Sequence, residues 1–417
     1  MNDKKLYERI LGITSPWHVA EVELKLENGQ VLIAVEGSVE SERCPECGLR
    51  CPRYDSKERR WRHLDTCQYQ TILRAKIPRI KCHEHGVRQV RVPWAEERSR
   101  FTALFEALVI DWLRATESIG AVSKGMGLTW EEVSGIRSRA VDRGMKRRGR
   151  AELPAAVGVD ETSISRGHEY ITVVNALSEA RVVDVMDERT EQSLNSFWQQ
   201  YSAVELARVE KVAMDMWPAY ITSTRKALPF ADEKIVFDKF HILKHLGEAV
   251  DTVRRSEHRE LRAEDDHRLS KTKYLWLTRP ERLDAEARAR IERLRRGSLL
   301  TARAYRYKEH ASQLWGYVRR GMAERLWRQW LHGALRCALE PIRIVARMIR
   351  NHWAGVINAA TSDITNAMSE SVNSHIQRIK KRACGFRSRT RFREAILFHL
   401  GGLDLYPVFP SSIHSKA

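Results

Sequence analysis

The alternation of hydrophobic and polar positions changes its period several times between residues 155 and 240. Short β-branched runs bounded by turn residues are typical of buried strands, whereas apolar residues three and four apart indicate a helix. The predicted strands cover 157–162, 170–177, 180–186, 209–214 and 235–237. A helix over 190–201 follows the third strand, and a helix opened by Pro218 follows the fourth. The order β-β-β-α-β-α-β predicts an α/β sheet in which a meander precedes parallel crossover strands.

Two acids stand on strands that this order makes neighbours. Asp160 lies inside the first strand and Asp215 directly follows the fourth. A buried carboxylate is costly unless it is paired or bound to a metal, so both side chains need a partner. Acids that face each other across adjacent strands can share divalent cations, and hard oxygen ligands favour Mg²⁺ or Mn²⁺. The sequence therefore predicts a cation site between these strands.

A third acid for such a site is expected from a helix that runs to about Arg382. Glu370 is the best candidate, and spacings of four and three place Asn366 and Asn373 on the same helix face. These two asparagines and His241 are candidates for contacts with the acids. Helix capping, an exposed polar position and core packing, respectively, are their structural alternatives.

The N-terminal region predicts a small β-rich domain with a metal site. Apolar alternation on both sides of Asn28-Gly29 indicates a β-hairpin. Two pairs with knuckle spacing, CxxC and CxxH, are separated by a strand-like segment, which is how a zinc ribbon assembles its ligands. The expected ligands of a structural Zn²⁺ are Cys44, Cys47, Cys82 and His85. His83 is an alternative fourth ligand, Cys51, His63 or Cys67 could take part, and ordinary buried thiols are the structural alternative.

Residues 98–150 predict a helix-turn-helix. Residues 101–114 are amphipathic behind a Thr102 cap, and a short helix, a glycine turn and a longer basic helix over 130–146 follow. In that plan the second helix enters the major groove of DNA. The expected DNA contacts on it are Ser134, Arg137, Ser138 and Arg139. A purely structural helix pair is the alternative.

Helical periodicity dominates residues 242–362, with five tryptophans expected to lie in its core. A basic run over 378–393 follows the Glu370 helix directly and could hold a DNA backbone beside the acids. The candidates in this run are Arg378, Lys380, Lys381, Arg382 and Arg387. A solvated charged face is the alternative for each of them.

Composition agrees with a polyanionic partner. The chain has 72 Lys and Arg against 54 Asp and Glu, a net charge of +18 and a pI near 9.7. No apolar run of about 18 residues and no secretory leader is present, so we expect a cytoplasmic, nucleoid-associated protein. Five of its seven cysteines lie before residue 83, and this clustering favours metal over disulfides.

Several short sequence motifs, in their order along the chain, resemble those of a known protein family. GVDET, AMDMWPAY, FDKFHILKH and an NxxxExxN followed by HIQRIKKRACGFR resemble a bacterial insertion-sequence transposase of the DDE class, in particular the ISL-three (ISL3) family. The resemblance implies an RNase H-like catalytic core with Asp160, Asp215 and Glu370 as a triad that binds two Mg²⁺ or Mn²⁺ ions. It also implies an N-terminal zinc ribbon, in which the second pair is usually CxxC, so His85 is a departure.

The expected architecture is multidomain: an α/β RNase H-like core interrupted by an all-α insertion and preceded by a zinc ribbon and a helix-turn-helix. The expected divisions are 1–97 (ribbon about 40–95), 98–150, 151–241 for the first part of the core, 242–362 for the insertion, 363–405 for the last helix and basic segment, and 406–417 for a tail.

The expected function is metal-dependent cleavage and strand transfer of double-stranded DNA. The partners would be the terminal inverted repeats of the element and the target, held by a homodimer or larger assembly. An RNase H-like nuclease or resolvase, and a transposase-derived DNA-binding regulator without catalysis, are the alternatives.

Overall fold

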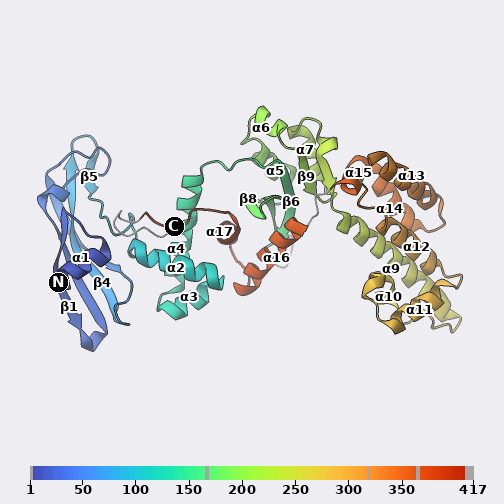
Figure 1. Ribbon diagram of the computed structural model, residues 1–417, viewed down its shortest axis with the longest axis horizontal. Coiled ribbons are helices and arrows are strands. Elements are labelled where there is room, and N and C mark those ends of the chain that lie inside the picture. The colour runs from blue at the N-terminus through green and yellow to red at the C-terminus, as the bar shows by residue number, and fades with distance from the viewer. Residues whose placement is uncertain (1–2, 165–168, 318, 363–366, 409–417) are drawn as a thin grey trace. The chain divides into compact units, whose positions relative to one another are not determined.

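The computed structural model describes residues 3–164, 169–317, 319–362 and 367–408 (Figure 1). The chain divides into two compact units. Unit 1 comprises residues 1–149, 381–384 and 402–417, and unit 2 comprises 150–380 and 385–401. No helix among the described residues has the length and apolar character needed to span a bilayer.

Unit 1 begins with a five-stranded sheet in the order β1-β2-β4-β3, with β5 paired to β4. The elements are α1 (Asp3–Leu11), β1 (Trp17–Lys25), β2 (Gln30–Gly37), β3 (Arg53–Arg62), β4 (Gln70–Cys82) and β5 (Gly86–Gln89). The hairpin predicted at Asn28-Gly29 is confirmed, because β1 and β2 are antiparallel and Lys25 pairs with Gln30. Gly29 has a φ of 61°, a left-handed conformation that glycine adopts without strain.

Three helices complete unit 1: α2 (Ala103–Thr116), α3 (Ile119–Met126) and α4 (Trp130–Arg148). The hydroxyl of Thr102 accepts a hydrogen bond from the Phe105 N–H, as the sequence predicted, and Thr129 forms a capping box with Glu132. Arg143 of α4 is 8% exposed and donates to both Glu96 and Glu106. The predicted short helix, glycine turn and long helix are therefore present.

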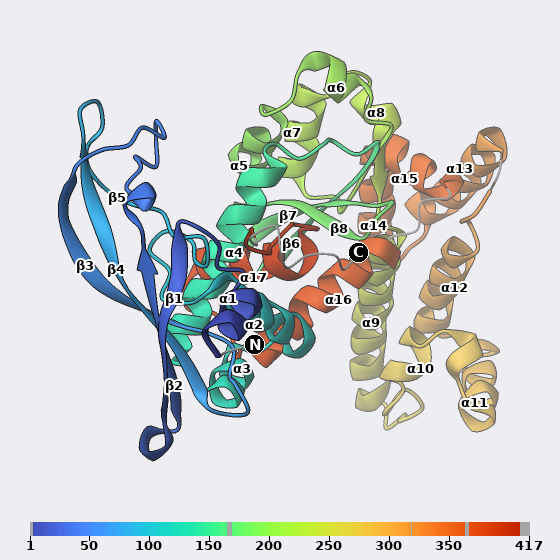
Figure 2. The ribbon, with the colours of Figure 1, turned by 60° about the vertical axis from the view of Figure 1, so that its left-hand side comes forward.

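Unit 2 contains the second five-stranded sheet, in the order β10-β9-β6-β7-β8 (Figure 2). Its strands are β6 (Ala156–Ser163), β7 (Tyr170–Ala176), β8 (Arg181–Asp187), β9 (Lys211–Met214) and β10 (Ile235–Phe237). Strands β6, β7 and β8 form an antiparallel meander, whereas β9 is parallel to both β6 and β10. The predicted order of strands and the two predicted helices are confirmed, and two further short helices, α6 and α8, were not predicted. The helices between the strands are α5 (Glu191–Trp198), α6 (Ala203–Ala207), α7 (Pro218–Ala227) and α8 (Ala231–Lys234).

A block of helices follows β10. It comprises α9 (Lys239–Ala263), α10 (Lys273–Leu277), the 3-10 helix η3 (Pro280–Arg282), α11 (Ala285–Arg295), α12 (Leu300–Ser312), α13 (Arg320–Arg336), α14 (Glu340–Asn351) and α15 (Trp353–Thr361). Across residues 239–317 and 319–362 no strand occurs, as predicted. Trp276, Trp327 and Trp330 are at most 2% exposed, which confirms their place in the core. Two more helices follow: α16 (Ala367–Arg382), whose last two residues belong to unit 1, and α17 (Arg389–Leu400) of unit 2.

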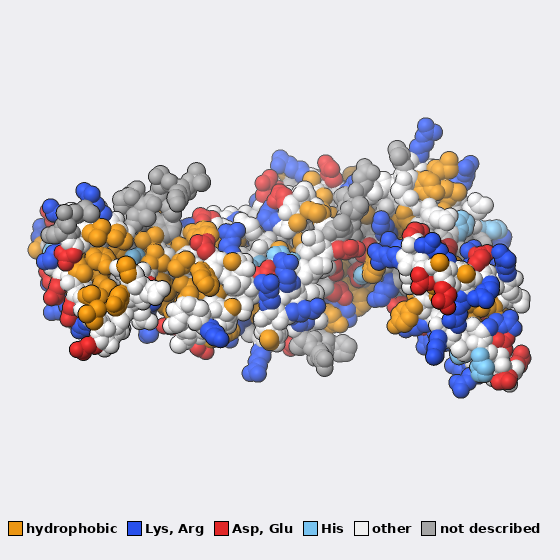
Figure 3. All heavy atoms as spheres, turned by 60° about the horizontal axis from the view of Figure 1, so that its bottom comes forward, with side chains coloured by type: hydrophobic (Ala, Val, Ile, Leu, Met, Phe, Trp, Pro, Cys, Tyr) orange, Lys and Arg blue, Asp and Glu red, His pale blue; other side chains and the backbone are white. Residues whose placement is uncertain are grey.

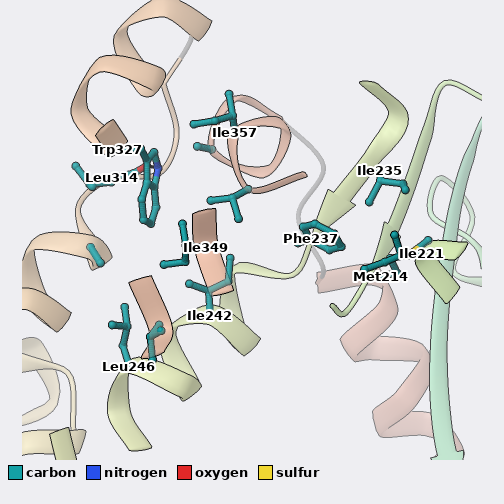
Figure 4. Close-up of a cluster of buried hydrophobic side chains, with 14 of the residues drawn as sticks. Met214, Ile221, Ile235, Phe237, Ile242, Leu246, Leu314, Trp327, Ile349 and Ile357 are labelled. Carbon is teal, nitrogen blue, oxygen red and sulfur yellow. Dashed lines mark hydrogen bonds between the residues drawn. The ribbon is translucent and has the colours of Figure 1, made fainter. Parts of the chain in front are cut away.

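The helical block and the sheet share one hydrophobic core. Figure 4 shows Met214, Ile235 and Phe237 of the two parallel strands in the same cluster as Ile242 and Ile349 of α9 and α14. Helix α15 lies so close to β10 that a Cβ built on Gly355 would be 2.3 Å from the Phe237 ring. The side-chain amide of Asn358 donates to the backbone oxygens of Asp232, Glu233 and Ile235 at 2.9, 3.1 and 2.7 Å.

The close approach at Gly355 predicts a specific loss of stability. Gly355→Leu should lower the free energy of unfolding by about 1–3 kcal/mol or more, because the new side chain overlaps Phe237. Gly321→Leu on α13 is the control, since a Cβ there has no neighbour within 4 Å, and its effect should stay within about 0.5 kcal/mol. Urea unfolding followed by tryptophan fluorescence measures both. Equal effects would contradict the packing described.

Candidate functional site

A cluster of three thiols and one imidazole lies at one end of the N-terminal sheet. Cys44 and Cys47 come from the segment between β2 and β3, Cys82 ends β4, and His85 lies in the turn before β5. The Nδ1 of His85 is 3.7 Å from Cys44 Sγ and 3.6 Å from Cys82 Sγ, and Cys47 Sγ is 3.8 Å from Cys82 Sγ. Among the described residues, this is the one group of Cys, His, Asp and Glu side chains arranged to hold an ion.

These separations fit a tetrahedral zinc ion. Ligands at the usual Zn–S and Zn–N distances, about 2.3 and about 2.0 Å, stand about 3.8 Å (S···S) and about 3.5 Å (S···N) apart. At Cys82 the backbone supports the thiolate form that zinc requires. The His85 backbone N–H and its ring lower the pKa of Cys82 to about 6. Four protein ligands leave no open coordination position, so the ion would be structural.

The structure groups His85, rather than His83, with the three thiols. His83 is exposed, as is Cys67. The Cys51 thiol lies 3.4 Å from the Leu49 backbone oxygen, and the buried His63 ring hydrogen-bonds Thr102 at 2.8 Å. His63 and Cys67 therefore have other surroundings, whereas Cys51 lies next to the Cys82 thiol without belonging to the four-residue group.

The two acids predicted to converge lie on adjacent strands of unit 2. Gly158 of β6 pairs with Ala213 of β9, and continuing this parallel register by two residues sets Asp160 opposite Asp215. Burial raises the pKa of Asp160. Burial and the charge of Glu161 raise the pKa of Asp215 to about 6. Both shifts arise because ionised carboxylates are poorly solvated here and repel one another.

Helix α16 lies against β6 beside these acids. The Asn373 amide donates to Asp160 Oδ2, Gln377 donates to Thr162 Oγ1 at 2.9 Å, and Lys380 donates to the Ser163 backbone oxygen at 2.7 Å. The helix can approach because residue 158 is glycine. A Cβ there would be 2.0 Å from Asn175 Oδ1 and 2.8 Å from Ser369 Oγ. The predicted contact of Asn373 with an acid is present, whereas Asn366 lies outside the described residues.

Glu370 flanks this contact face. It is one residue, or about 100° around the helix, from Ser369, which touches β7 through Asn175. Its side chain is exposed. In the described part of the chain it does not belong to an ion-holding group with Asp160 and Asp215. The structure thus brings two of the three predicted acids together and leaves the third on the adjoining helix.

His241 and Asp238 border the acids on the other side. The Nδ1 of His241 is 3.7 Å from Asp215 Oδ2, and its Nε2 is 4.0 Å from Asp238 Oδ2. Asp238 caps α9 by accepting the Phe240 N–H at 2.8 Å. The predicted proximity of His241 to the acids is therefore observed.

Sequence reasoning missed a neighbouring Glu161–Arg189 pair. The two side chains form an ion pair at 3.1 Å, and the guanidinium lies 4.2 Å from the Tyr170 ring centroid and 4.4 Å from that of Trp217. The second oxygen of Glu161, Oε2, is buried and has no hydrogen-bond partner among the described residues. The consecutive acids of the Asp160-Glu161 doublet were the available signal.

Three family models match successive parts of the chain. A family model described as "Transposase", for ISL3, matches residues 157–396. Residues 40–85 match the zinc-finger of transposase IS204/IS1001/IS1096/IS1165, and residues 90–141 match the helix-turn-helix domain of transposase family ISL3. The chain belongs to the ISL3 family of transposases.

Two curated relatives are similar over nearly their whole length. The transposase for insertion sequence element IS1001 of Bordetella parapertussis is 25% identical over 398 residues, which cover 94% of this chain and 97% of the relative. The transposase for IS1557 of Mycobacterium tuberculosis is 26% identical over 420 residues, 93% of each chain. Both matches span the ribbon, the helix-turn-helix and the core of this ISL3-family member.

The structure changes the candidate DNA contacts of the helix-turn-helix. Ser134 and Arg137 are 6% and 4% exposed, so the prediction that they contact DNA is corrected: they lie on the packed face of α4. Arg139 is ion-paired with the buried Glu106. Lys146 and Arg147 are exposed on the last turn of α4. This basic helix has charged residues on both its packed face and its exposed face, and hydrophobic periodicity alone did not show which residues lie on which face.

The basic run after Glu370 is mostly exposed. Lys380 is the exception, because its ammonium is bonded to Ser163. Exposed side chains in this run are Arg378, Lys381, Arg382 and Arg387.

Zinc content tests the fourth ligand of the ribbon. The purified protein should contain about one zinc per chain, and His85→Ala should lose most of it because three thiolates no longer complete the tetrahedron. His83→Ala, two residues away and exposed, is the matched control and should keep its zinc. Elemental analysis after dialysis measures both. Loss in the His83 variant alone would mean that the other imidazole is the ligand.

The raised pKa of Asp215 predicts a pH-dependent stability. A carboxyl whose pKa rises from 3.8 to about 6 on folding loses stabilising free energy as pH increases through that window. In EDTA at pH 7.5, Asp215→Asn should therefore be more stable than the unsubstituted protein, on the order of 1–3 kcal/mol. The difference should shrink towards pH 4.

Urea unfolding at both pH values measures this difference. Glu210→Gln, at an exposed acid, is the control and should show no such gain. A destabilised Asp215→Asn at neutral pH would show that the carboxylate is satisfied by the protein alone.

Proposed function

We propose that this ISL3-family protein binds the terminal inverted repeats of its element, cuts DNA there with the help of divalent cations, and joins the freed ends to a target. The observation that carries the proposal is the convergence of Asp160, on β6, and Asp215, directly after the neighbouring strand β9, with the pKa values of both raised by burial and by the charge of Glu161. Such a costly arrangement is typical of functional sites.

An RNase H-like core is the fold that this function needs. The antiparallel meander followed by two parallel strands supports it, because the first and fourth strands of the sheet, β6 and β9, become neighbours and bring their acids together. On this proposal the helical block between β10 and α16 is an insertion, since it separates the sheet from the helix that contacts Asp160.

The donor atoms suit Mg²⁺ or Mn²⁺. Carboxylate oxygens are the hard ligands that these ions prefer, and Glu161 Oε2, buried and without a hydrogen-bond partner among the described residues, is a further oxygen near them. When bound, two such ions supply the activation of an attacking oxygen and the stabilisation of a leaving oxygen. We assign Asp160, Asp215 and Glu370 as their ligands. Glu370 would reach the site from its flanking position on α16.

Other side chains orient these ligands. The Asn373 amide donates to Asp160 Oδ2, and the Glu161 backbone N–H donates to Asp160 Oδ1 at 2.7 Å. The Trp217 backbone N–H donates to Asp215 Oδ1 at 3.2 Å. His241 stands between Asp215 and Asp238, and in its protonated form it would balance their charge.

The same site can serve two successive reactions. Water attacks the phosphodiester at the element end, the P–O3′ bond breaks, and a 3′-hydroxyl is released. That hydroxyl then attacks a target phosphodiester, forming a new P–O bond as the target P–O3′ bond breaks. Because each step is an attack of an oxygen on phosphorus, one triad is sufficient.

Unit 1 and the basic run over 378–393 would bind the DNA. The net charge of +18 favours phosphate contacts, and the helix-turn-helix match favours duplex recognition by α4. Pairing of two element ends makes a homodimer or a larger assembly the expected active form.

An assay on labelled terminal repeats with Mg²⁺ tests the function. The unsubstituted protein should give cleaved and joined products. Asp160→Asn, Asp215→Asn and Glu370→Gln should each reduce both products by at least about 100-fold, because each removes a ligand charge, while DNA binding is retained. Glu210→Gln is the matched control with an exposed acid.

The products separate the alternatives. Nicks without joined products indicate a nuclease or resolvase. A stable shift without cleavage, unaffected by the acid substitutions, indicates a regulator. Full activity of Glu370→Gln would remove that residue from the triad and leave the other two in place.

A further inference from the structure

A large groove lies in the helical block of unit 2. It has a volume of about 1370 Å³ and runs between α9, α10, η3, α11 and α12. Small-molecule sites usually enclose about 300–1,000 Å³ and are more closed. The size and openness of this groove fit a segment of a polymer better than a metabolite.

One end of the groove lies beside the acids. Lys239 and Phe240, on the first turn of α9, line it, and they directly follow Asp238. The next residue, His241, points to Asp215 at 3.7 Å. A chain that leaves the acidic site past α9 would therefore enter the groove within one helical turn.

The charge of the groove suits phosphates. Eight Lys and Arg residues line it against five Asp and Glu residues. Three of the acids, Asp251, Glu292 and Glu309, are already ion-paired to basic side chains. Lys239, Lys244 and Arg279 form no ion pair with any described residue. Figure 3 shows Lys and Arg side chains spread over these helices, at its right-hand end, with acids between them.

The apolar part of the lining favours unpaired bases. Phe240 is 53% exposed at the end nearest the acids. Aromatic side chains with basic neighbours bind single strands, because each base offers its face for stacking. A duplex keeps its base faces inside its own stack and would leave this aromatic surface uncovered.

We propose that this groove binds a single-stranded DNA segment that emerges from the acidic site. Phosphates lie along Lys239, Lys244 and Arg279, and a base stacks on Phe240. The inference rests on the proposed function for the origin of the strand. The increase in affinity that an unpaired extension gives can, however, be measured with a duplex of any sequence.

The experiment compares two labelled DNAs by fluorescence anisotropy with the zinc-loaded full chain and without added Mg²⁺ or Mn²⁺. One is a blunt duplex, and the other is the same duplex with a ten-nucleotide oligothymidylate extension. The ratio of the two Kd values gives the contribution of the extension to binding, because the contacts of unit 1 with the duplex are the same for both DNAs and cancel in the ratio. We expect the extension to improve affinity about 10-fold or more in the unsubstituted protein.

The Lys239→Glu, Lys244→Glu, Arg279→Glu triple variant should lose this gain. All three side chains are exposed, so folding should be unaffected, as a thermal melt would verify. In this variant, binding of the extended DNA should also depend less on salt. The slope of log K against log salt should be smaller by about 2, because each of the three lost phosphate contacts contributes about 0.7. Phe240→Ala should reduce the gain without changing the slope.

The matched control is Arg293→Glu, Arg303→Glu, Arg306→Glu, with exposed arginines on α11 and α12 outside the groove lining. It changes the net charge equally and should keep the gain. Three results would overturn the proposal: no gain in the unsubstituted protein, a gain that persists in the groove variant, or equal loss in the control. Failure of end cleavage with a groove-dependent gain would instead reject the proposed function alone.

Discussion

The constraint on which unit 2 depends is the partial burial of two carboxylates, Asp160 on β6 and Asp215 directly after the parallel strand β9. Their surroundings solvate the ionised forms of Asp160 and Asp215 poorly, and the nearby charge of Glu161 repels both, so both pKa values are raised. Without cations the arrangement opposes folding, so the rest of the unit must hold it. The glycine at 158 lets α16 approach β6, and Asn373 fixes Asp160 by a hydrogen bond. The guanidinium of Arg189, which lies against two aromatic rings, forms an ion pair with Glu161.

The free energy that holds these acids comes largely from the core that the sheet shares with the helical block. The cluster runs from Val157 and Val212 in the sheet to Trp327 and Trp330 in α13. Asn358 and Gly355 of α15 fix the block to β10 by hydrogen bonds and by close packing. Because the block is joined to the sheet by a continuous apolar interface, the start of α9 has a defined place beside Asp215. The groove that begins there is consequently at a defined position relative to the acids.

Unit 1 is stabilised in a different way. Its sheet has its own small core, and one end of that sheet is formed by loops that bring Cys44, Cys47, Cys82 and His85 together. Four ligands from two distant segments cross-link those loops when zinc is bound. In the helices that follow, Arg143 sits between Glu96 and Glu106. A buried charge network of this kind ties α4 to α2, and Arg139, a predicted DNA contact, also pairs with Glu106.

The sequence by itself determined what is local. Periods of two and 3.6, turn residues and caps gave the strand order of unit 2, the hairpin at Gly29, the helix-turn-helix and both zinc knuckles, because each depends on residues a few positions apart. Only the tertiary structure decided which side chains meet. In the structure His85, rather than His83, lies with the three thiols, and Ser134 and Arg137 are buried. Glu161 is ion-paired with Arg189, and the exposed Glu370 lies at the flank of the contact face of α16. These outcomes depend on contacts between segments far apart in the chain, such as Asn373 with Asp160, and hydrophobic periodicity carries no information about them.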